Sequence, residues 1–159
     1  MTSTSTPELE MRSQYIILPT AMAEEIESVV QRRSVTFGDV CWLAWELAKE
    51  SLLEKLPASI SIDVDDEEPE TFTRPKYRQC LPPWFVEAPA SAVSDLPRKL
   101  DENGMVAKVE LTVRLPVSRW VEIRDVAVYR DGSLSRVYEE AYLIARPYVI
   151  GWREAVISP

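Results

Sequence analysis

An internal repeat constrains the fold of this chain more than any other feature of its sequence. Residues 13–52 align with residues 110–149 at a constant offset of 97 positions, and no gap is needed. Near-matches such as Trp45 with Tyr142 and Lys49 with Arg146 lie between the identities. Repetition at a fixed offset indicates that one structural unit occurs twice. The identical pairs are Leu18 and Leu115, Pro19 and Pro116, Glu25 and Glu122, Ile26 and Ile123, Val29 and Val126, Arg33 and Arg130, Val40 and Val137, Ala44 and Ala141, and Ala48 and Ala145.

Each copy begins with a short strand that ends at a proline. In the second copy Val109, Leu111, Val113 and Leu115 alternate with polar residues, which is the period of a strand with one buried face. The proline of the Leu-Pro dipeptide ends the strand, and its fixed φ angle suits the first turn of a helix. The pattern therefore predicts a strand that leads directly into a helix.

Two helices joined by a short turn follow in each copy. The turns read RRSVT and RDGS, and Thr36 and Ser133 are the expected N-caps of second helices that end near Leu53 and Tyr148. Apolar residues recur at the spacing of one helix face. They are Met22, Ile26, Val29 and Val30, then Val40, Cys41, Ala44, Trp45 and Ala48 in the first copy, and Trp120, Ile123, Val126 and Ala127, then Val137, Tyr138, Ala141, Tyr142 and Ala145 in the second.

The second copy has an alternative interpretation. The stretch VAVYRDGSLSRVY could form a β-hairpin around Asp131-Gly132, because Asp-Gly is a frequent hairpin turn. The first copy has no such turn signal, so the agreement between the copies favours two helices in both.

The same order of elements occurs twice in the chain. It consists of a strand, a Leu-Pro dipeptide, a helix, a short turn and a second helix that begins at Ser or Thr. This order resembles the ribbon-helix-helix family of prokaryotic DNA-binding proteins. Apolar residues stand 3, 7 and 10 positions after the first proline, at Met22, Ile26 and Val29, and Val35 and Thr36 follow at 16 and 17. The resemblance covers about half of the chain, and the recurrence in register makes it more specific than a single copy would be.

The resemblance implies a mainly α fold with a short β-ribbon. A single unit cannot bury its strand and helices alone, so we expect the two units to form an intramolecular pseudo-dimer. Pairing of each unit with its counterpart in a second chain is the alternative. The expected divisions are a disordered tail at 1–11, unit 1 at 12–53, an acidic proline-rich connector at 54–107, unit 2 at 108–149 and a C-terminal tail at 150–159.

In the family the outward side chains of the ribbon contact base edges, and the N-terminus of each second helix binds a phosphate. The residues that match the outward ribbon positions are Ser13, Tyr15 and Ile17 in the first copy and Glu110, Thr112 and Arg114 in the second. Thr36 and Ser133 match the helix N-termini, and Lys108, Arg12 and Arg119 could add positive charge. Arg114 is the best candidate for reading a guanine, whereas Ile17 and Glu110 depart from the family pattern.

The charge of the chain argues against non-specific binding to nucleic acid. The formal net charge is −8, and such binding depends on neutralising phosphates. The charge is uneven, because residues 105–159 carry eight basic and seven acidic groups while residues 1–104 hold all of the excess acid. If the ribbon binds DNA, the second copy is therefore expected to contribute more than the first.

Other classes of function find little support. The chain has no histidine and two cysteines, Cys41 and Cys80, so we expect no catalytic site, cofactor or metal centre. The acidic run DDEEPE could ligate a divalent cation but is more typical of a solvated surface. The N-terminus lacks the order of a signal peptide, and no apolar run is long enough to span a membrane, so we expect a cytoplasmic protein.

The connector suggests contacts of its own. Its stretch QCLPPWFVEAP could pack onto the helices as a lid or bind a partner protein, and SAVSDLPRKL could form a short helix capped by Ser94 or Asp95. We therefore expect a sequence-specific DNA-binding protein, a transcriptional regulator such as a repressor. One alternative is an antitoxin-like protein whose acidic connector binds a basic toxin. A second alternative is an interaction scaffold that has lost DNA binding.

Overall fold

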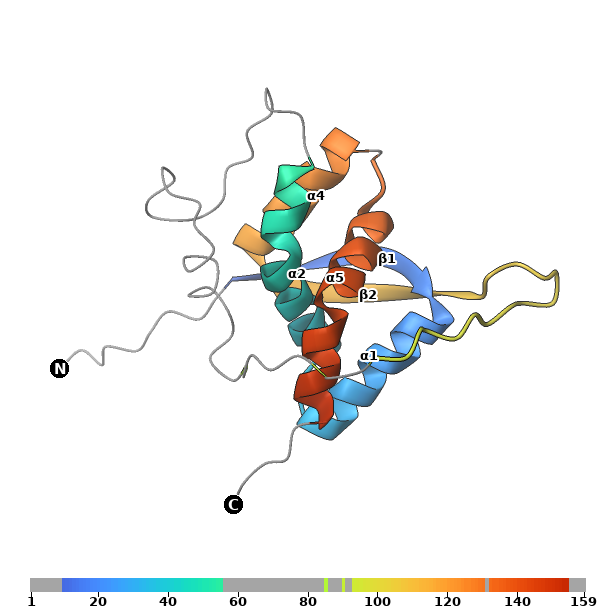
Figure 1. The fold of residues 1–159 in the computed structure, drawn as a ribbon. Helices are drawn as coiled ribbons and strands as arrows, with labels where there is room; N and C mark the ends of the chain where they lie inside the picture. The colour runs from blue at the N-terminus through green and yellow to red at the C-terminus, as the bar shows by residue number, and fades with distance from the viewer. Residues whose placement is uncertain (1–9, 56–84, 86–89, 91–92, 131, 155–159) are drawn as a thin grey trace, which may run out of the picture.

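The structure is a computed structural model that describes residues 10–55, 85, 90, 93–130 and 132–154. In these residues the protein is mainly helical, with one two-stranded antiparallel sheet (Figure 1). The elements follow in the order β1 (Met11–Pro19), α1 (Thr20–Arg33), α2 (Phe37–Glu54), β2 (Lys108–Pro116), α4 (Val117–Arg130) and α5 (Leu134–Glu154). The predicted class, mainly α with a short ribbon, is confirmed.

The two strands that the repeat predicts pair with each other inside the chain. Their antiparallel register runs from Met11 opposite Pro116 to Pro19 opposite Lys108, and Tyr15 faces Thr112 at the centre. The first amide of each following helix extends this pairing. Thr20 donates to the Ala107 carbonyl and Val117 to the Glu10 carbonyl, both at 2.9 Å.

The bounds of the elements repeat with the offset seen in the sequence. β1 and β2, and likewise α1 and α4, begin and end 97 residues apart, and so do the first residues of α2 and α5. The turns match as well, because Val35 donates to the Val30 carbonyl and Gly132 to the Ala127 carbonyl. The alternative β-hairpin in the second copy is wrong, since the segments on either side of the expected turn belong to α4, which ends at Arg130, and to α5, which begins at Leu134.

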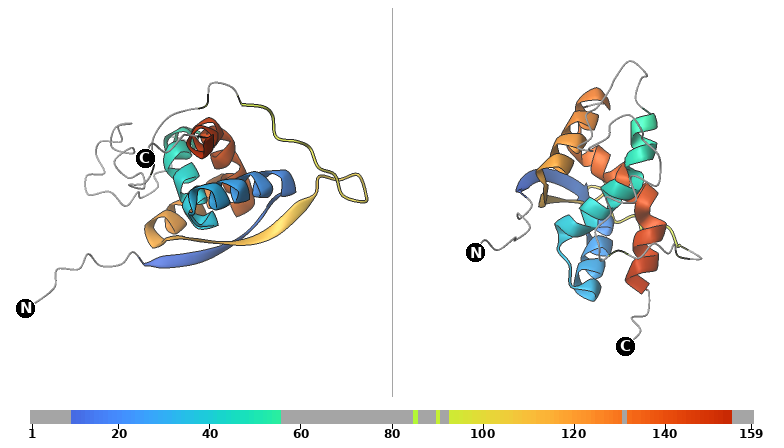
Figure 2. Two further views of the ribbon diagram at one scale, coloured as in Figure 1. Left: turned by 90° about the horizontal axis from the view of Figure 1, so that it is seen from below. Right: turned by 90° about the vertical axis from the view of Figure 1, so that its left-hand side faces the viewer.

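All four helices lie on one side of the ribbon (Figure 2, left). The inward strand residues Ile16, Leu18, Val113 and Leu115 are buried against them. The predicted core positions of the second helices are buried, including Ala44, Trp45, Ala141 and Tyr142. Cys41 is a core residue as expected, and burial raises the pKa of its thiol.

The end of α5 differs from the expectation. The helix continues through Pro147 to Glu154, so residues 150–154 are not part of a tail. Ile150 and Trp152 are buried, and this burial favours helix over the break that an internal proline promotes. Phe85 of the connector packs edge-on against Trp152, with ring centroids 6.4 Å apart. This contact agrees with the expected lid at that residue.

The last part of the connector forms a loop that leads into β2. Leu100 pairs with Val106, and the Asp101 carboxylate accepts from the amides of Asn103 and Met105. No helix forms at 93–99, so the predicted short helix is wrong. The expected tail at 1–11 extends too far, because Met11 already belongs to β1. Residues 1–9, Cys80, the acidic run, the Pro-Pro-Trp stretch and residues 155–159 lie outside the described residues. Within the described part, no helix combines the length and the apolar character needed to cross a bilayer.

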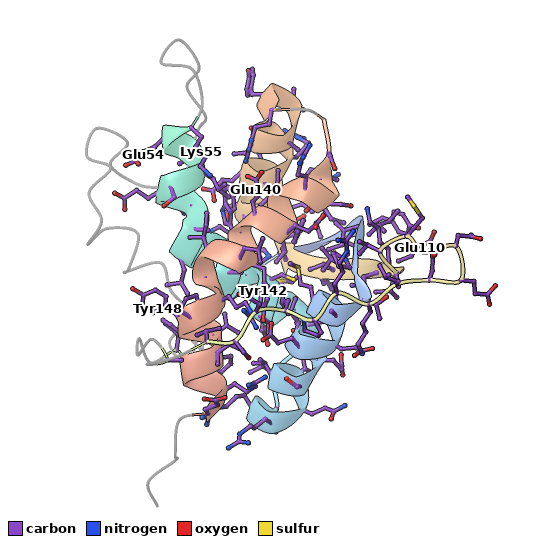
Figure 3. The ribbon with its side chains drawn as sticks, turned by 45° about the vertical axis from the view of Figure 1, so that its right-hand side comes forward. Glu54, Lys55, Glu110, Glu140, Tyr142 and Tyr148 are labelled. Carbon is purple, nitrogen blue, oxygen red and sulfur yellow. The ribbon has the colours of Figure 1, made fainter. Side chains whose placement is uncertain are left out.

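Two glutamates on the first helices bind the second helices of the opposite copy. Glu25 of α1 accepts from the Tyr142 hydroxyl at 2.9 Å and pairs with Arg146 at 2.9 Å, both on α5. Tyr142 lies among the helices in Figure 3. Glu122 of α4 accepts from the Trp45 indole at 2.8 Å and pairs with Lys49 at 3.5 Å, both on α2. The repeat thus places an aromatic donor and a cation four residues later around each glutamate.

Candidate nucleic-acid interface

The ribbon presents its predicted outward side chains on the face away from the helices. Alternation along each strand buries the even-numbered residues from Gln14 to Leu18 in β1 and buries Val113 and Leu115 in β2. The register sets Ser13 opposite Arg114, Tyr15 opposite Thr112 and Ile17 opposite Glu110, with Lys108 at the strand end. The structure therefore gathers all six predicted outward residues, together with Lys108, on one exposed face.

Tyr15 is the most prominent apolar group of this face, with 56% of its surface exposed. A hydrogen bond with Glu110 raises the pKa of Tyr15, and the nearby negative charge acts in the same direction. Glu110 lies toward the end of the ribbon from which the 93–107 loop extends (Figure 3). The carboxylate therefore engages the tyrosine hydroxyl and reduces the positive potential at this end of the face.

The opposite end of the ribbon is basic. Arg12 of β1 and Arg124 of α4 both stack on the Trp120 ring, at 4.4 and 5.3 Å from its centroid. The Trp120 indole donates to the Ser13 carbonyl at 2.9 Å, so this cluster adjoins Ser13 and its partner Arg114. Helical spacing predicts Trp120 in the helix core, whereas the structure places it half-buried at the ribbon. Trp120 and Arg124 are four residues apart and therefore share one helix face, and this spacing was the sequence signal for their contact.

The two second helices begin close to the ribbon, and both predicted N-caps are confirmed. Thr36 caps α2 in a reciprocal arrangement: its hydroxyl accepts from the Asp39 amide, and the Asp39 carboxylate accepts from the Thr36 amide. Ser133 caps α5 through the Arg136 amide at 3.2 Å. An acidic side chain thus occupies the start of α2 and a basic one the equivalent position of α5. The start of α5 is the better place for a phosphate.

A hollow in the surface adjoins the start of α5. Its walls include cations, Lys108 and Arg136, and the Ser135 hydroxyl, which accepts from the Ile17 amide at 2.8 Å. Glu139 also lines it, and burial is the main cause that raises the pKa of this carboxyl, although Lys108 and Arg136 lower it. The lining residues are Ile17, Lys108, Ser133, Ser135, Arg136, Glu139, Glu140 and Leu143.

Arg119 does not belong to this interface. Its position beside the strand predicts a source of positive charge, but only 8% of the residue is exposed. Its guanidinium lies 2.5 Å from Glu46 and 3.3 Å from Glu122 in the interior. Burial raises the pKa of the Glu46 carboxyl, and the neighbouring Lys49 and Arg119 oppose that shift. The repeat held a signal for this outcome, because Arg119 aligns with Met22 on a core-facing stripe.

No protein-family model matches the chain, and no curated protein or solved structure is significantly similar to it. Within the described residues, no cluster of three or more acidic or cysteine side chains is arranged to hold a metal ion.

Proposed function

We propose that the protein is a sequence-specific DNA-binding regulator built as a tandem ribbon-helix-helix pseudo-dimer. The exposed face of the β1–β2 ribbon carries this proposal. It is a narrow antiparallel pair of strands with every outward side chain exposed and with no described helix over it. A two-stranded ribbon of this kind fits the major groove of B-DNA, where side chains reach base edges.

The internal equivalence supports the pseudo-dimer. The strand register, the helix bounds, the turns and the glutamate contacts all repeat with an offset of 97 residues. In a pair of this kind the central residues, Tyr15 and Thr112, occupy equivalent positions and face each other. The DNA site would be an imperfect palindrome, because equivalent ribbon residues differ in chemistry.

The charges favour an unequal contribution from the two copies. Arg114, Lys108 and Arg136 belong to the second copy, whereas Asp39 occupies the start of α2 in the first. Arg12, which is stacked on Trp120, is the main basic group of the first copy at the ribbon. Phosphates would therefore be held chiefly at the basic ribbon end and at the start of α5.

Replacing Arg114 with Ala tests the proposal. We expect specific binding to weaken by roughly 1–3 kcal/mol and the preference at one base pair to relax, because Arg can donate two hydrogen bonds to guanine. Ile17→Ala should cost less, since it loses only an apolar contact. Fluorescence anisotropy at two salt concentrations, with DNA from upstream of its own gene, would measure both.

Arg32→Ala is the matched control, because Arg32 is an exposed cation in the last turn of α1. It removes the same charge away from the ribbon and should leave binding nearly unchanged. If wild type binds no DNA specifically at low salt, or if Arg114→Ala binds as well as wild type, the proposal fails.

A protein-interaction scaffold is the second candidate, and the Tyr15–Glu110 hydrogen bond favours it. A carboxylate on the ribbon and a net charge of −8 suit a basic protein partner better than a polyanion. Glu110→Gln separates the candidates. It should strengthen binding to DNA by removing a repelling charge, and it should weaken binding to a basic protein.

A further inference from the structure

Four ionisable side chains lie buried together where α2 meets α4. Glu46 and Lys49 come from α2, and Arg119 and Glu122 come from α4. The contacts between the helices are Arg119 to Glu46 at 2.5 Å and Lys49 to Glu122 at 3.5 Å. Each helix also holds an internal pair, Glu46 with Lys49 and Arg119 with Glu122. Two positive and two negative charges balance, and a buried charge is costly unless it is balanced in this way.

The equivalent group between α1 and α5 is smaller and also balanced. Glu25 pairs with Arg146, and the side chains are only 10% and 12% exposed. The positions equivalent to Glu46 and Arg119 are Leu143 and Met22, which bring no charge. The extra ion pair therefore exists on one side of the molecule and not on the other.

We call residues 12–53 half one and residues 108–149 half two. The buried charges balance only when half one pairs with half two. If two copies of half one paired, the second helix of each copy would meet the first helix of the other. Each of these two contacts would bury Glu46, Lys49 and Glu25, with one excess negative charge. Two copies of half two would place Arg119, Glu122 and Arg146 in each group, with one excess positive charge. Either arrangement buries uncompensated charge twice.

A buried hydrogen bond gives the same result independently. The Gln14 side chain accepts from the Tyr138 hydroxyl and donates to the Trp120 carbonyl at 3.0 Å. The equivalents of Gln14 and Tyr138 are Leu111 and Cys41. Two copies of half one would set Gln14 against Cys41, and two copies of half two would set Tyr138 against Leu111. A buried polar group would lose its partner in each arrangement.

We propose that the Arg119–Glu46 ion pair and the Gln14–Tyr138 hydrogen bond determine pairing specificity. Each half recognises the other half and rejects a second copy of itself. The partner that fits the buried surface of half one is half two, and the pairing of each unit with its counterpart in another chain is disfavoured. The inference rests on the internal equivalence in the proposed function but not on DNA binding, which its test does not measure.

A disulfide trap in the full chain tests the proposal. Residue 112 faces Tyr15 within the chain, but it would face residue 112 of a second chain if two copies of half two paired. Thr112→Cys, in a Cys80→Ser background, is unfolded and refolded at rising protein concentration in a glutathione redox buffer. Non-reducing peptide mapping by mass spectrometry then measures the covalent dimer linked through residue 112 of both chains, as distinct from links that involve Cys41. The same chain with Gln14→Leu, Glu46→Leu, Arg119→Met and Tyr138→Phe is the comparison.

The Thr112→Cys chain that keeps all four pairing residues should give almost no covalent dimer. The fourfold variant should give roughly tenfold more or higher, increasing with concentration, because its halves no longer discriminate. Equal yields from the two chains would overturn the proposal. If circular dichroism shows that the fourfold variant does not fold, Glu46→Leu with Arg119→Met alone is put through the same trap. A yield from this double variant no higher than that of the intact chain would also overturn it.

Discussion

At the scale of single residues, the buried polar side chains join the two halves of the molecule. The aligned pairs Glu25 and Glu122, Trp45 and Tyr142, and Lys49 and Arg146 were visible in the sequence as matches or near-matches. Their role was not visible, because the contacts run from the first helix of one copy to the second helix of the other. A repeat shows which positions are equivalent, but it does not show which positions meet.

Gly38 illustrates a close approach that only the structure reveals. A Cβ atom at this position would lie 2.2 Å from the Arg114 carbonyl oxygen, which belongs to the β2 backbone and has little freedom to move. We expect Gly38→Ala to lower the free energy of unfolding by about 1–2 kcal/mol, since the overlap outweighs the better helix propensity of Ala. Urea unfolding followed by circular dichroism would measure the change.

Ser51→Ala provides the control for that experiment, because Ser51 is exposed on the same helix. Its effect should stay within about 0.5 kcal/mol of wild type. A Gly38→Ala protein as stable as wild type would show that α2 moves away from β2 at little cost, and the close approach would then have no structural importance.

At the scale of elements, equivalent helices differ where they begin. Both second helices start on a hydroxyl cap, but only α2 has the reciprocal bond from Asp39. In α5 the same position holds Arg136, whose charge opposes the helix dipole at an N-terminus. The two copies therefore share the same fold at the start of the second helix but differ in the charge of the side chain there.

The two caps should differ in their contribution to stability. Thr36→Ala removes a hydrogen bond from a complete capping box and should cost about 1–2 kcal/mol. Ser133→Ala removes one longer bond and should cost about 0.5–1 kcal/mol. The midpoints of denaturant unfolding at unchanged slope would establish the order. An equal or reversed order would mean that the Asp39 bond adds nothing to α2.

Most elements could be predicted because apolar periodicity and the repeat act locally. The strands, the helices, the caps and the buried faces of the second helices follow from spacing alone. The extension of α5 could not be predicted in this way. It depends on the burial of Ile150 and Trp152 and on contacts with Phe85 and Ala90, which are distant in the sequence. Tertiary packing there outweighs the local effect of Pro147.

At the scale of the whole molecule, the sheet is completed within one chain. β1 pairs with β2 of the same molecule, so folding is expected to be unimolecular. The thermal midpoint should stay constant over about a hundredfold range of protein concentration, whereas a native state of two chains would become more stable as concentration rises. Melting curves followed by circular dichroism would test this. A midpoint that rises with concentration would contradict it.

The candidate interface was predictable in part. Alternation along the strands identified the outward residues from Ser13 to Ile17 and from Lys108 to Arg114, and the structure exposes all of them. Apolar periodicity alone did not reveal that Arg12 and Arg124 gather on Trp120 or that Arg119 turns inward, although the Trp120–Arg124 spacing and the repeat held signals for these contacts. Those outcomes depend on what lies opposite each helix, and periodicity identifies only the apolar face.

The pairing of β1 with β2 in one molecule also has a genetic consequence. In a protein whose ribbon is assembled from two separate chains, a defective subunit pairs with normal ones and inactivates the assemblies that contain it. Here each molecule carries both strands of its own ribbon, so a damaged copy does not take the place of a strand in a normal chain. Mutations that destroy the fold should therefore behave as recessive, and a second gene copy with a changed ribbon can diverge without disturbing the first.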